Sequence, residues 1–412
     1  VVLRNFALLH LLGSVVDQRR AADVALHFWY SAFMPHDYVL HVSSSFASLA
    51  QGKGDFDLSL GGGASSLSGR VSADTLLLMA RMQTSVYTVE DVNNEINPLP
   101  YLTPRRFSEA RVDLHHRLYC RLEPSHRLSH LEFRRFGLTL PFSAQNAWFN
   151  SPNRSLFSPE GRYMQGDLAN PLDSWDPVAV VEAGRHHGAP RADLYGCLYF
   201  YLSDQLREFH ARLARFHIKF KMFDLDTVAL SGAIRSGSHS KFGLPPSTRF
   251  DRIDVSNVVD VEYVGLRGVV KAWGGLMRDS PHATLLAYFM NWAAGNNDAQ
   301  PGKDAMRQLT TRMVTEGKVR DRPSAKYITS AALFDNSPAF AVFLSSLRIQ
   351  PVLDDMGLKL KEEHTISPHR YYAPLGAPPS ALPVFPDAET WYLRTNIGAP
   401  LWSERYVEIC RA

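Results

Sequence analysis

The order of apolar segments in this 412-residue chain predicts an α/β fold with a mostly parallel sheet flanked by helices. Residues 216–223, FHIKFKMF, alternate apolar and polar side chains as a half-buried strand does, and residues 250–257, FDRIDVSN, read as an apolar strand that ends in small polar residues. A helical pattern over 261–277 leads to a third apolar segment at 282–292, HATLLAYFMNW. Strand, helix and strand in this order indicate parallel strands joined by crossover helices.

The remaining segments predict mainly helices. Residues 51–70 are rich in glycine and serine and predict a mobile loop, whereas 391–397, WYLRTNI, predict a last strand. Residues 138–176 are rich in proline, asparagine and aromatic side chains and are expected to cross the surface. Apolar residues at helical spacing predict helices over 1–16, 21–33, 73–84, 108–122, 177–187 and 195–214, with one or two more after residue 305.

Composition shifts divide the chain into four expected segments. A stretch broken by three prolines, 90–104, marks the first boundary. Residues 1–104 are expected to hold the N-terminal helical part of an α/β domain, and 105–176 an arginine-rich helix and a proline- and aromatic-rich surface segment. Residues 177–300 are expected to form the α/β core, on which the C-terminal extension 301–412 packs.

Composition and charge argue against several classes of protein. Hydrophobic residues make up 45% and charged residues 21%, as in globular proteins, and the net charge of +3 is too small to indicate a nucleic-acid or membrane binder. Cys120, Cys197 and Cys410 are scattered and form no CxxC pair, so no disulfide framework and no metal site is predicted. No apolar run approaches the roughly 20 residues that span a bilayer. We expect a cytoplasmic protein without metal and without a membrane segment.

Polar residues at the ends of the predicted strands are the candidate ligand-binding residues. In an open parallel sheet, ligands bind beyond the carboxyl ends of the strands. Ser and Asn at such positions also begin turns and cap helices, and the pattern favours this structural interpretation. The candidates are Asp224, Asp254, Ser256, Asn257 and Asn291.

A group of arginines is the candidate surface for an acidic partner or RNA. Glu109, Asp113, Glu123 and Glu132 are interleaved with it, which favours a solvated helical face with local ion pairs. An aromatic stripe over 195–209 can stack a base, although core packing explains it better. The arginines are Arg105, Arg106, Arg111, Arg117, Arg121, Arg127, Arg134 and Arg135.

Several blocks of sequence resemble a family of fungal proteins. The blocks are VVLRNFALLHLLG, ALHFWYSAF, LYGCLYFYLSDQLREF, FDRIDVSN with VEYVGLRGVVKAWGGLM, and HATLLAYFMNW. They resemble proteins grouped under the uncharacterised domain DUF4470, which is distantly similar to assembly factor 3 of axonemal dyneins. The resemblance implies a methyltransferase-like Rossmann domain whose nucleotide-binding turn would precede Val1, so residues 1–104 would belong to an incomplete domain. No cofactor is then expected for this chain.

Three hypotheses follow, from different classes of function. The first is a non-catalytic interaction or assembly protein on a methyltransferase-like scaffold, with a protein partner. The second is a methyltransferase-type enzyme that uses S-adenosylmethionine and has lost its N-terminal segment. The third is an enzyme that acts on RNA or aminoacyl-tRNA, which the arginine group and the aromatic stripe suggest. The first is our leading hypothesis.

Overall fold

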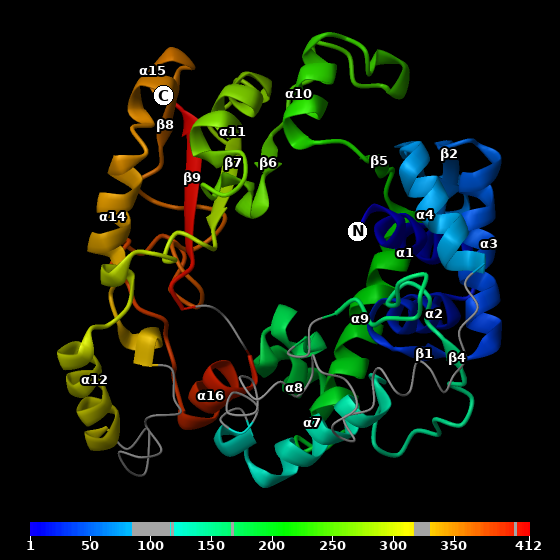
Figure 1. The fold of residues 1–412 in the computed structure, drawn as a ribbon, viewed down its shortest axis with the longest axis horizontal. Coiled ribbons are helices and arrows are strands. Elements are labelled where there is room, and N and C mark those ends of the chain that lie inside the picture. Colours follow the sequence, from blue (N-terminus) through cyan, green and yellow to red (C-terminus); the bar gives the residue numbers. More distant parts are fainter. Residues whose placement is uncertain (85–115, 117–118, 166–168, 317–329, 399–401) are drawn as a thin grey trace. The chain divides into compact units, whose positions relative to one another are not determined.

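The computed structural model describes residues 1–84, 116, 119–165, 169–316, 330–398 and 402–412. They form two compact units, Val1–Leu225 and Asp226–Ala412, which are described separately (Figure 1). The division after Leu225 falls inside the segment 177–300 that the sequence predicts as one core. Of the described residues, 51% are helical and 12% lie in strands.

Helices dominate the first unit, and side-chain caps fix several of their ends. Asp17 begins the second helix by accepting hydrogen bonds from the backbone N–H groups of Arg19 and Arg20, and Asp193 caps the longest helix by accepting from Gly196 N–H. The helices among its described residues are α1 (Val2–Ser14), α2 (Gln18–Tyr30), α3 (His36–Gln51), α4 (Ala73–Thr84), α7 (Pro124–Phe136), α8 (Pro177–His186) and α9 (Leu194–Arg215).

A small sheet completes the first unit. Strands β2 (Asp55–Leu60) and β3 (Ser65–Arg70) form an antiparallel hairpin, and β5 (Lys219–Phe223) pairs with β3 in parallel. The predicted mobile loop over 51–70 is therefore wrong. Gly61, Gly62 and Gly63 all have positive φ and make the turn between the strands, so the glycines that suggested a loop are those that close the hairpin. A further short pair joins β1 (Phe33–Met34) and β4 (Ser151–Pro152).

The second unit is built on a four-stranded mixed sheet. Its strands are ordered β6 (Arg252–Asp254), β7 (Thr284–Phe289), β9 (Arg405–Arg411) and β8 (Leu358–Leu360). Strands β6 and β7 are parallel neighbours, with α11 (Gly265–Trp273) between them in the chain, as the sequence predicts for this part. Strand β9 pairs in antiparallel fashion with both β7 and β8.

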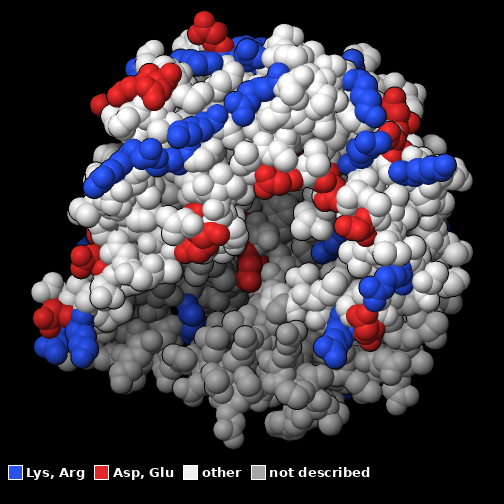
Figure 2. Space-filling view, turned by 45° about the horizontal axis from the view of Figure 1, so that its top comes forward, with Lys and Arg blue, Asp and Glu red and all other residues white. Residues whose placement is uncertain are grey.

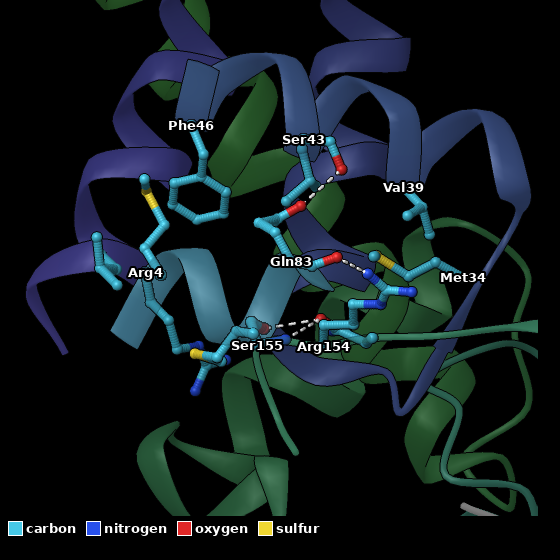
Figure 3. Close-up of a pocket in the computed structure, with 13 residues that line it drawn as sticks. Arg4, Met34, Val39, Ser43, Phe46, Gln83, Arg154 and Ser155 are labelled. Carbon is cyan, nitrogen blue, oxygen red and sulfur yellow. Dashed lines mark hydrogen bonds between the residues drawn. The ribbon is translucent and has the colours of Figure 1, made fainter. Parts of the chain in front are cut away.

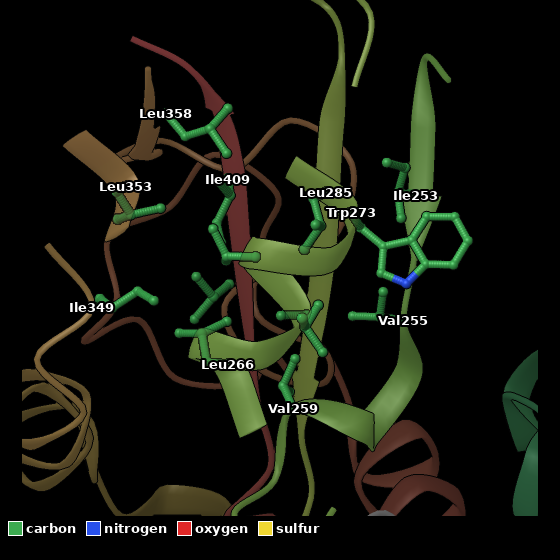
Figure 4. Packing of buried hydrophobic residues seen from close by; sticks show 14 of the residues in the cluster. Ile253, Val255, Val259, Leu266, Trp273, Leu285, Ile349, Leu353, Leu358 and Ile409 are labelled. Carbon is green, nitrogen blue, oxygen red and sulfur yellow. The ribbon is translucent and has the colours of Figure 1, made fainter. Parts of the chain in front are cut away.

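One face of this sheet carries the core of the second unit. Alternate residues of the strands, such as Ile253, Leu285 and Ile409, lie on the face of the sheet that α11 covers. There they form one cluster with Leu266 and Trp273 of α11 (Figure 4). The helices around the sheet are α10 (Thr227–Arg235), α11, α14 (Ser337–Ser346) and α15 (Gln350–Asp355), and the unit also contains α12 (Lys303–Thr315) and α16 (Ala388–Tyr392).

The predicted α/β fold with a mostly parallel, Rossmann- or methyltransferase-like sheet is wrong. In the described part of the chain the sheets hold two, three and four strands and are small and mixed. Strand β5 belongs to the first unit and pairs with β3, not with β6. The second neighbour of β7 is β9, from the far end of the chain. An exposed edge of a sheet favours pairing with a further strand, but the periodicity of a sequence does not show which segment supplies that strand.

The predicted strand at 391–397 is also wrong. Residues 388–392 form α16, and the chain continues as a π-helical turn, Leu393–Ile397. Asp387 caps this helix by accepting a hydrogen bond of 2.7 Å from Thr390 N–H. The cap favours a helix here, although the aromatic and branched side chains of the segment are equally compatible with a strand.

Candidate functional site

Asp224 lies in the first unit, where it joins β5 to the start of α4. Its carboxylate accepts a hydrogen bond of 2.6 Å from the Ser72 hydroxyl and another from the Thr75 hydroxyl. These two bonds hold the pKa of Asp224 below its ordinary value. The contacts give Asp224 a structural role and place it in a different unit from the other four predicted residues.

Asp254 and Ser256 form the turn that ends β6 in the second unit. The Asp254 carboxylate accepts a hydrogen bond of 2.8 Å from the backbone N–H of Ser256. Ser256 has a φ of 47°, in the left-handed region that residues other than glycine adopt infrequently. The bond from Asp254 holds this turn, as the structural interpretation of these residues predicts.

Asp260, which sequence reasoning missed, connects the segment after β6 to the residues that follow β7. Its carboxylate accepts hydrogen bonds from the backbone N–H groups of Met290 (3.3 Å) and Asn291 (3.0 Å), just after β7. The side-chain amide nitrogen of Asn257 lies 3.9 Å from the Met290 sulfur. Asp260 is buried, and this burial raises its pKa against the effect of the two backbone bonds. An aspartate inside the apolar run VVDVEYV was the one available signal.

Glu404 is a second buried carboxyl group near this edge that sequence reasoning missed. It lies just before β9, and burial raises its pKa to about 7, with a smaller contribution from the charge of Asp260 and an opposing hydrogen bond from Tyr288. The ring of Tyr288 stacks on that of Tyr406, with the ring centroids 4.8 Å apart. A buried carboxyl that titrates near neutral pH can act as an acid or base, but here its contacts join β7 to β9.

Replacing Glu404 with glutamine is expected to remove a pH dependence of stability. Native Glu404 stays protonated up to a pH of about 7, whereas the unfolded chain releases this proton near pH 4.3, its typical value. A raised native pKa stabilises the fold below the unfolded pKa, and this contribution is lost as the pH rises through the native pKa. We expect E404Q to exceed the unmodified chain in stability by about 2–3 kcal/mol at pH 8.

Urea unfolding of both chains at pH 5 and pH 8 measures this difference. The exposed Glu362 supplies the control E362Q, for which no such change is expected. An E404Q chain that loses as much stability between pH 5 and pH 8 as the unmodified chain would contradict the assignment.

Three of the predicted arginines lie on α7. Arg127 and Arg135 are exposed, Arg134 is half-buried, and the Arg127 Nε donates a hydrogen bond of 2.8 Å to the carbonyl of Leu122. Arg121 is half-buried, and its burial lowers its pKa. Arg105, Arg106, Arg111 and Arg117 lie outside the described residues.

A groove with both polar and apolar lining residues runs along α7. Its floor is formed by Phe133, whose ring stacks on that of Tyr195 with centroids 4.4 Å apart. Its other wall is the segment after α7, where Phe142 N–H donates a hydrogen bond of 2.8 Å to the Asp193 carboxylate. The lining residues include Glu132, Phe133, Phe136, Leu138, Leu140 and Phe142.

Exposed apolar side chains also lie on the outer face of α7. Leu128 and Leu131 are 53% and 45% exposed, and Phe136 and Phe142 at the rim of the groove are 39% and 48% exposed. The exposed Arg127 and Arg135 lie on the same helix. We call the groove together with these leucines and arginines the α7 surface.

Charge elsewhere on the molecule is mixed. Figure 2 shows Lys and Arg side chains interspersed with Asp and Glu side chains, and neither sign covers the whole of that face. In the described residues there is no group of three or more His, Cys, Asp or Glu side chains placed to hold a metal ion. None of the helices described is long and apolar enough to cross a membrane.

Comparison with protein-family models finds no match to this chain, and comparisons with curated proteins and with solved structures find none either. The resemblance to the DUF4470 proteins therefore stays a proposal.

Proposed function

We propose that this chain is a non-catalytic interaction protein that binds an acidic, apolar segment of a partner protein on the α7 surface. The observation that carries the proposal is the exposure of four large apolar side chains in one region of the surface: Phe136 and Phe142 line the groove, and Leu128 and Leu131 lie on the outer face of α7. Clustered apolar side chains on a protein surface mark interaction sites, whereas single exposed ones are ordinary. The proposal agrees with membership of the DUF4470 family and with an assembly role in the cytoplasm.

The groove is held in shape before any partner binds. Ser129 accepts a hydrogen bond of 3.1 Å from Leu194 N–H, which fixes α7 against the start of α9. Gly137 has a φ of 66° and ends α7, so the chain can turn back at once and form the opposite wall. A rigid groove loses little conformational freedom on binding, which favours affinity.

Charge indicates what kind of segment fits the α7 surface. Residues 124–136 contain three arginines and one glutamate, Glu132, which lines the groove. A partner segment that places apolar side chains in the groove therefore gains from acidic residues beside them. Arginine combined with exposed aromatic rings is also the composition typical of interaction hot spots.

The sheets of this chain do not suit a methyltransferase-type enzyme. Such a site needs a mostly parallel sheet, and the described residues form small mixed sheets. Asp224, Asp254 and Asp260 are each engaged in hydrogen bonds that hold turns or helix starts. These contacts support the non-catalytic reading.

A peptide-display selection against the full chain tests the proposal. We expect the selected peptides to combine Asp or Glu with large apolar residues. Replacing Phe142, which lines the groove, with glutamate should weaken their binding by at least about tenfold, because it places a charge against the apolar contact. The matched control is V342E, which makes the same kind of change at a Val342 that is 72% exposed in the second unit.

Two outcomes would overturn the proposal. One is a set of selected peptides that F142E binds as tightly as the unmodified chain does. The other is binding of a mixed-sequence single-stranded RNA that weakens steeply with added salt and is lost when Arg127 and Arg135 are replaced by glutamate, since this would make the α7 surface an RNA site.

A further inference from the structure

The cavity between α1, α3 and α4 in the first unit is too small for a ligand. Figure 3 shows it beside the Phe46 ring and Val39 of α3, with the Ser43 hydroxyl donating a hydrogen bond of 3.1 Å to the side-chain oxygen of Gln83. It holds about 40 Å³, which is room for only a few water molecules. The outside of the same unit offers a larger binding surface, at the edge of its sheet.

Strand β5 lies at this edge. In the described part of the chain the sheet has the order β2, β3, β5, so β3 is the only strand beside β5. The two strands are parallel, with Lys219 opposite Ser66 and Lys221 opposite Ser68. The open edge of a sheet presents backbone N–H and C=O groups that a further strand can join.

Hydrogen bonds at both ends of this pairing show which residues of β5 face β3. Ser66 N–H donates to the Ile218 carbonyl over 2.9 Å, and Asp224 N–H donates to the carbonyl of the last residue of β3 over 3.1 Å. In a parallel pair, alternate residues of a strand bond to the same neighbour. Lys219 and Lys221 therefore turn their backbone groups away from β3. We call these backbone groups, together with the two lysine side chains, the β5 edge.

The side chains of β5 divide between the two faces of the sheet. Phe220 and Met222 are half-buried and pack against the hydrophobic core of the first unit. Lys219 and Lys221 alternate with them on the other face, and both are exposed. One side of the β5 edge is therefore apolar and the other is basic.

The charge of the two lysines is not balanced by the neighbouring strand. Strand β3, with the sequence SSLSGR, contains no acidic residue, and the Lys221 Nζ donates a hydrogen bond of 2.7 Å to the Ser68 hydroxyl. Arg215 and His217, just before β5, are exposed and add to the basic character. A second copy of this chain does not suit the edge, because pairing of two β5 strands would bring basic residues together, and like charges opposite one another destabilise a strand pair.

We infer that the β5 edge binds an extended segment of a partner protein as a further strand, in which acidic residues alternate with apolar ones. The backbone groups of Lys219 and Lys221 bond to the main chain of the segment. Its acidic side chains lie beside the two lysines, and its apolar side chains lie beside Phe220 and Met222. Addition of a strand to an open sheet edge is a recurring mode of peptide recognition.

The β5 edge is separate from the α7 surface. Ser129 holds α7 against Leu194 at the start of α9. Strand β5 follows the other end of α9, where the rings of Phe220 and Phe209 have their centroids 6.2 Å apart. The 22 residues of α9 span about 33 Å. Neither proposal depends on the other.

Fluorescence anisotropy with short labelled peptides tests the inference on the full chain. One peptide alternates glutamate and valine, and a second has lysine in place of every glutamate. We expect the glutamate–valine peptide to bind and the lysine–valine peptide not to bind. No binding of the first, or equal binding of the two, would overturn the inference.

Methylation of the peptide backbone distinguishes strand pairing from attraction between charges. Along an added strand, the N–H groups of alternate residues face β5. Methylating the nitrogens of all glutamates removes one set of these donors, and methylating those of all valines removes the other. We expect one methylated peptide to lose at least about tenfold in affinity and the other to bind as before. Equal affinity of the two, whether kept or lost, would contradict strand pairing.

Variants of Lys219 separate backbone from charge on the side of the protein. K219P removes an N–H that faces the open edge, a position at which edge strands tolerate proline, and should weaken binding of the glutamate–valine peptide at least about tenfold. K219Q keeps the N–H and should weaken it only about two- to fivefold. The exposed Lys303 of the second unit supplies the control K303Q, for which no change is expected. Unchanged binding by K219P would overturn the inference, and the methylated peptides keep the test valid if K219P fails to fold.

The variant F142E separates this site from the α7 surface. It should bind the glutamate–valine peptide as the unmodified chain does. Loss of binding in F142E with full binding in K219P would place the peptide on the α7 surface, which overturns the present inference and leaves the proposed function standing.

Two other occupants would also overturn the inference. One is a dimer of this chain, detected by analytical ultracentrifugation, that K219P dissociates. The other is a mixed-sequence single-stranded RNA whose binding weakens steeply with added salt and is lost in K219Q, while the glutamate–valine peptide does not bind.

Discussion

Replacing Glu408 with alanine is expected to lower the free energy of unfolding of the second unit by about 3–5 kcal/mol, because it leaves buried donors without their acceptor. Glu408 is fully buried on β9 and accepts hydrogen bonds from the backbone N–H groups of Thr365 (3.1 Å), Ile366 (2.7 Å) and Ser367 (2.9 Å). Lys361 also donates to it, over 2.9 Å. One carboxylate thus holds the segment after β8 against the sheet.

The measurement is denaturant unfolding of the full chain, with hydrogen exchange of the peptide that contains β9 to localise the loss. Glu363 lies in the same segment and is exposed, so E363A is the matched control and should change stability by less than about 0.5 kcal/mol. Equal stability of E408A and E363A would show that water replaces these hydrogen bonds without cost.

The Glu408 carboxylate also makes the stability of the second unit depend on pH in the acid range. Burial alone would raise the pKa of Glu408, but hydrogen bonds from Ser367, Lys361, Thr365 and Ile366 outweigh it and hold the pKa at about 2. A native pKa below the unfolded one stabilises the fold above the unfolded pKa, and this contribution is lost as the pH falls through the native pKa. The unmodified chain should therefore lose stability between about pH 4.5 and pH 2, and E408Q should lose less over this range.

Replacing Phe289 with alanine is expected to destabilise the second unit by about 3–5 kcal/mol, because it leaves a cavity in the core. Phe289 is fully buried at the end of β7, the strand between β6 and β9. Its ring makes edge contacts with the rings of Phe340 and Phe343 of α14, with centroid distances of 5.4 and 5.8 Å. Such aromatic pairs add to the effect of burial.

The variant F289L keeps most of the side-chain volume and serves as the control. It should be less destabilising than F289A when both are measured by denaturant unfolding under the same conditions. A loss of the same size in both variants would mean that the aromatic contacts, and not the filled volume, stabilise this end of β7.

Local pattern predicted the parts of the fold whose side chains repeat regularly. The succession of β6, α11 and β7 was predicted because its apolar residues follow first the period of a strand, then that of a helix and then that of a strand again. Strand β9, RYVEICR, was missed because Glu408 interrupts its apolar run. That carboxylate is tolerated only because three backbone N–H groups more than forty residues earlier in the chain meet it.

The candidate site shows the same limit. The sequence placed Asp224, Ser256, Asn257 and Asn291 near one sheet edge, but Asp224 lies in the other unit. The structure adds Asp260, which accepts a hydrogen bond from Asn291 N–H. Its importance depends on burial and on contacts with a strand thirty residues away, which no local pattern shows. The α7 surface was anticipated only through its arginines, because the exposure of Leu128 and Leu131 is a property of the folded chain.

The most direct test of the proposed interaction is a charge exchange across the α7 surface. A selected acidic peptide is titrated by fluorescence anisotropy into the unmodified chain and into a chain with Arg127 and Arg135 replaced by glutamate. A second peptide carries lysine at every acidic position. We predict that the first peptide binds the unmodified chain and that only the second binds the altered chain. Equal affinity of the first peptide for both chains would contradict the account.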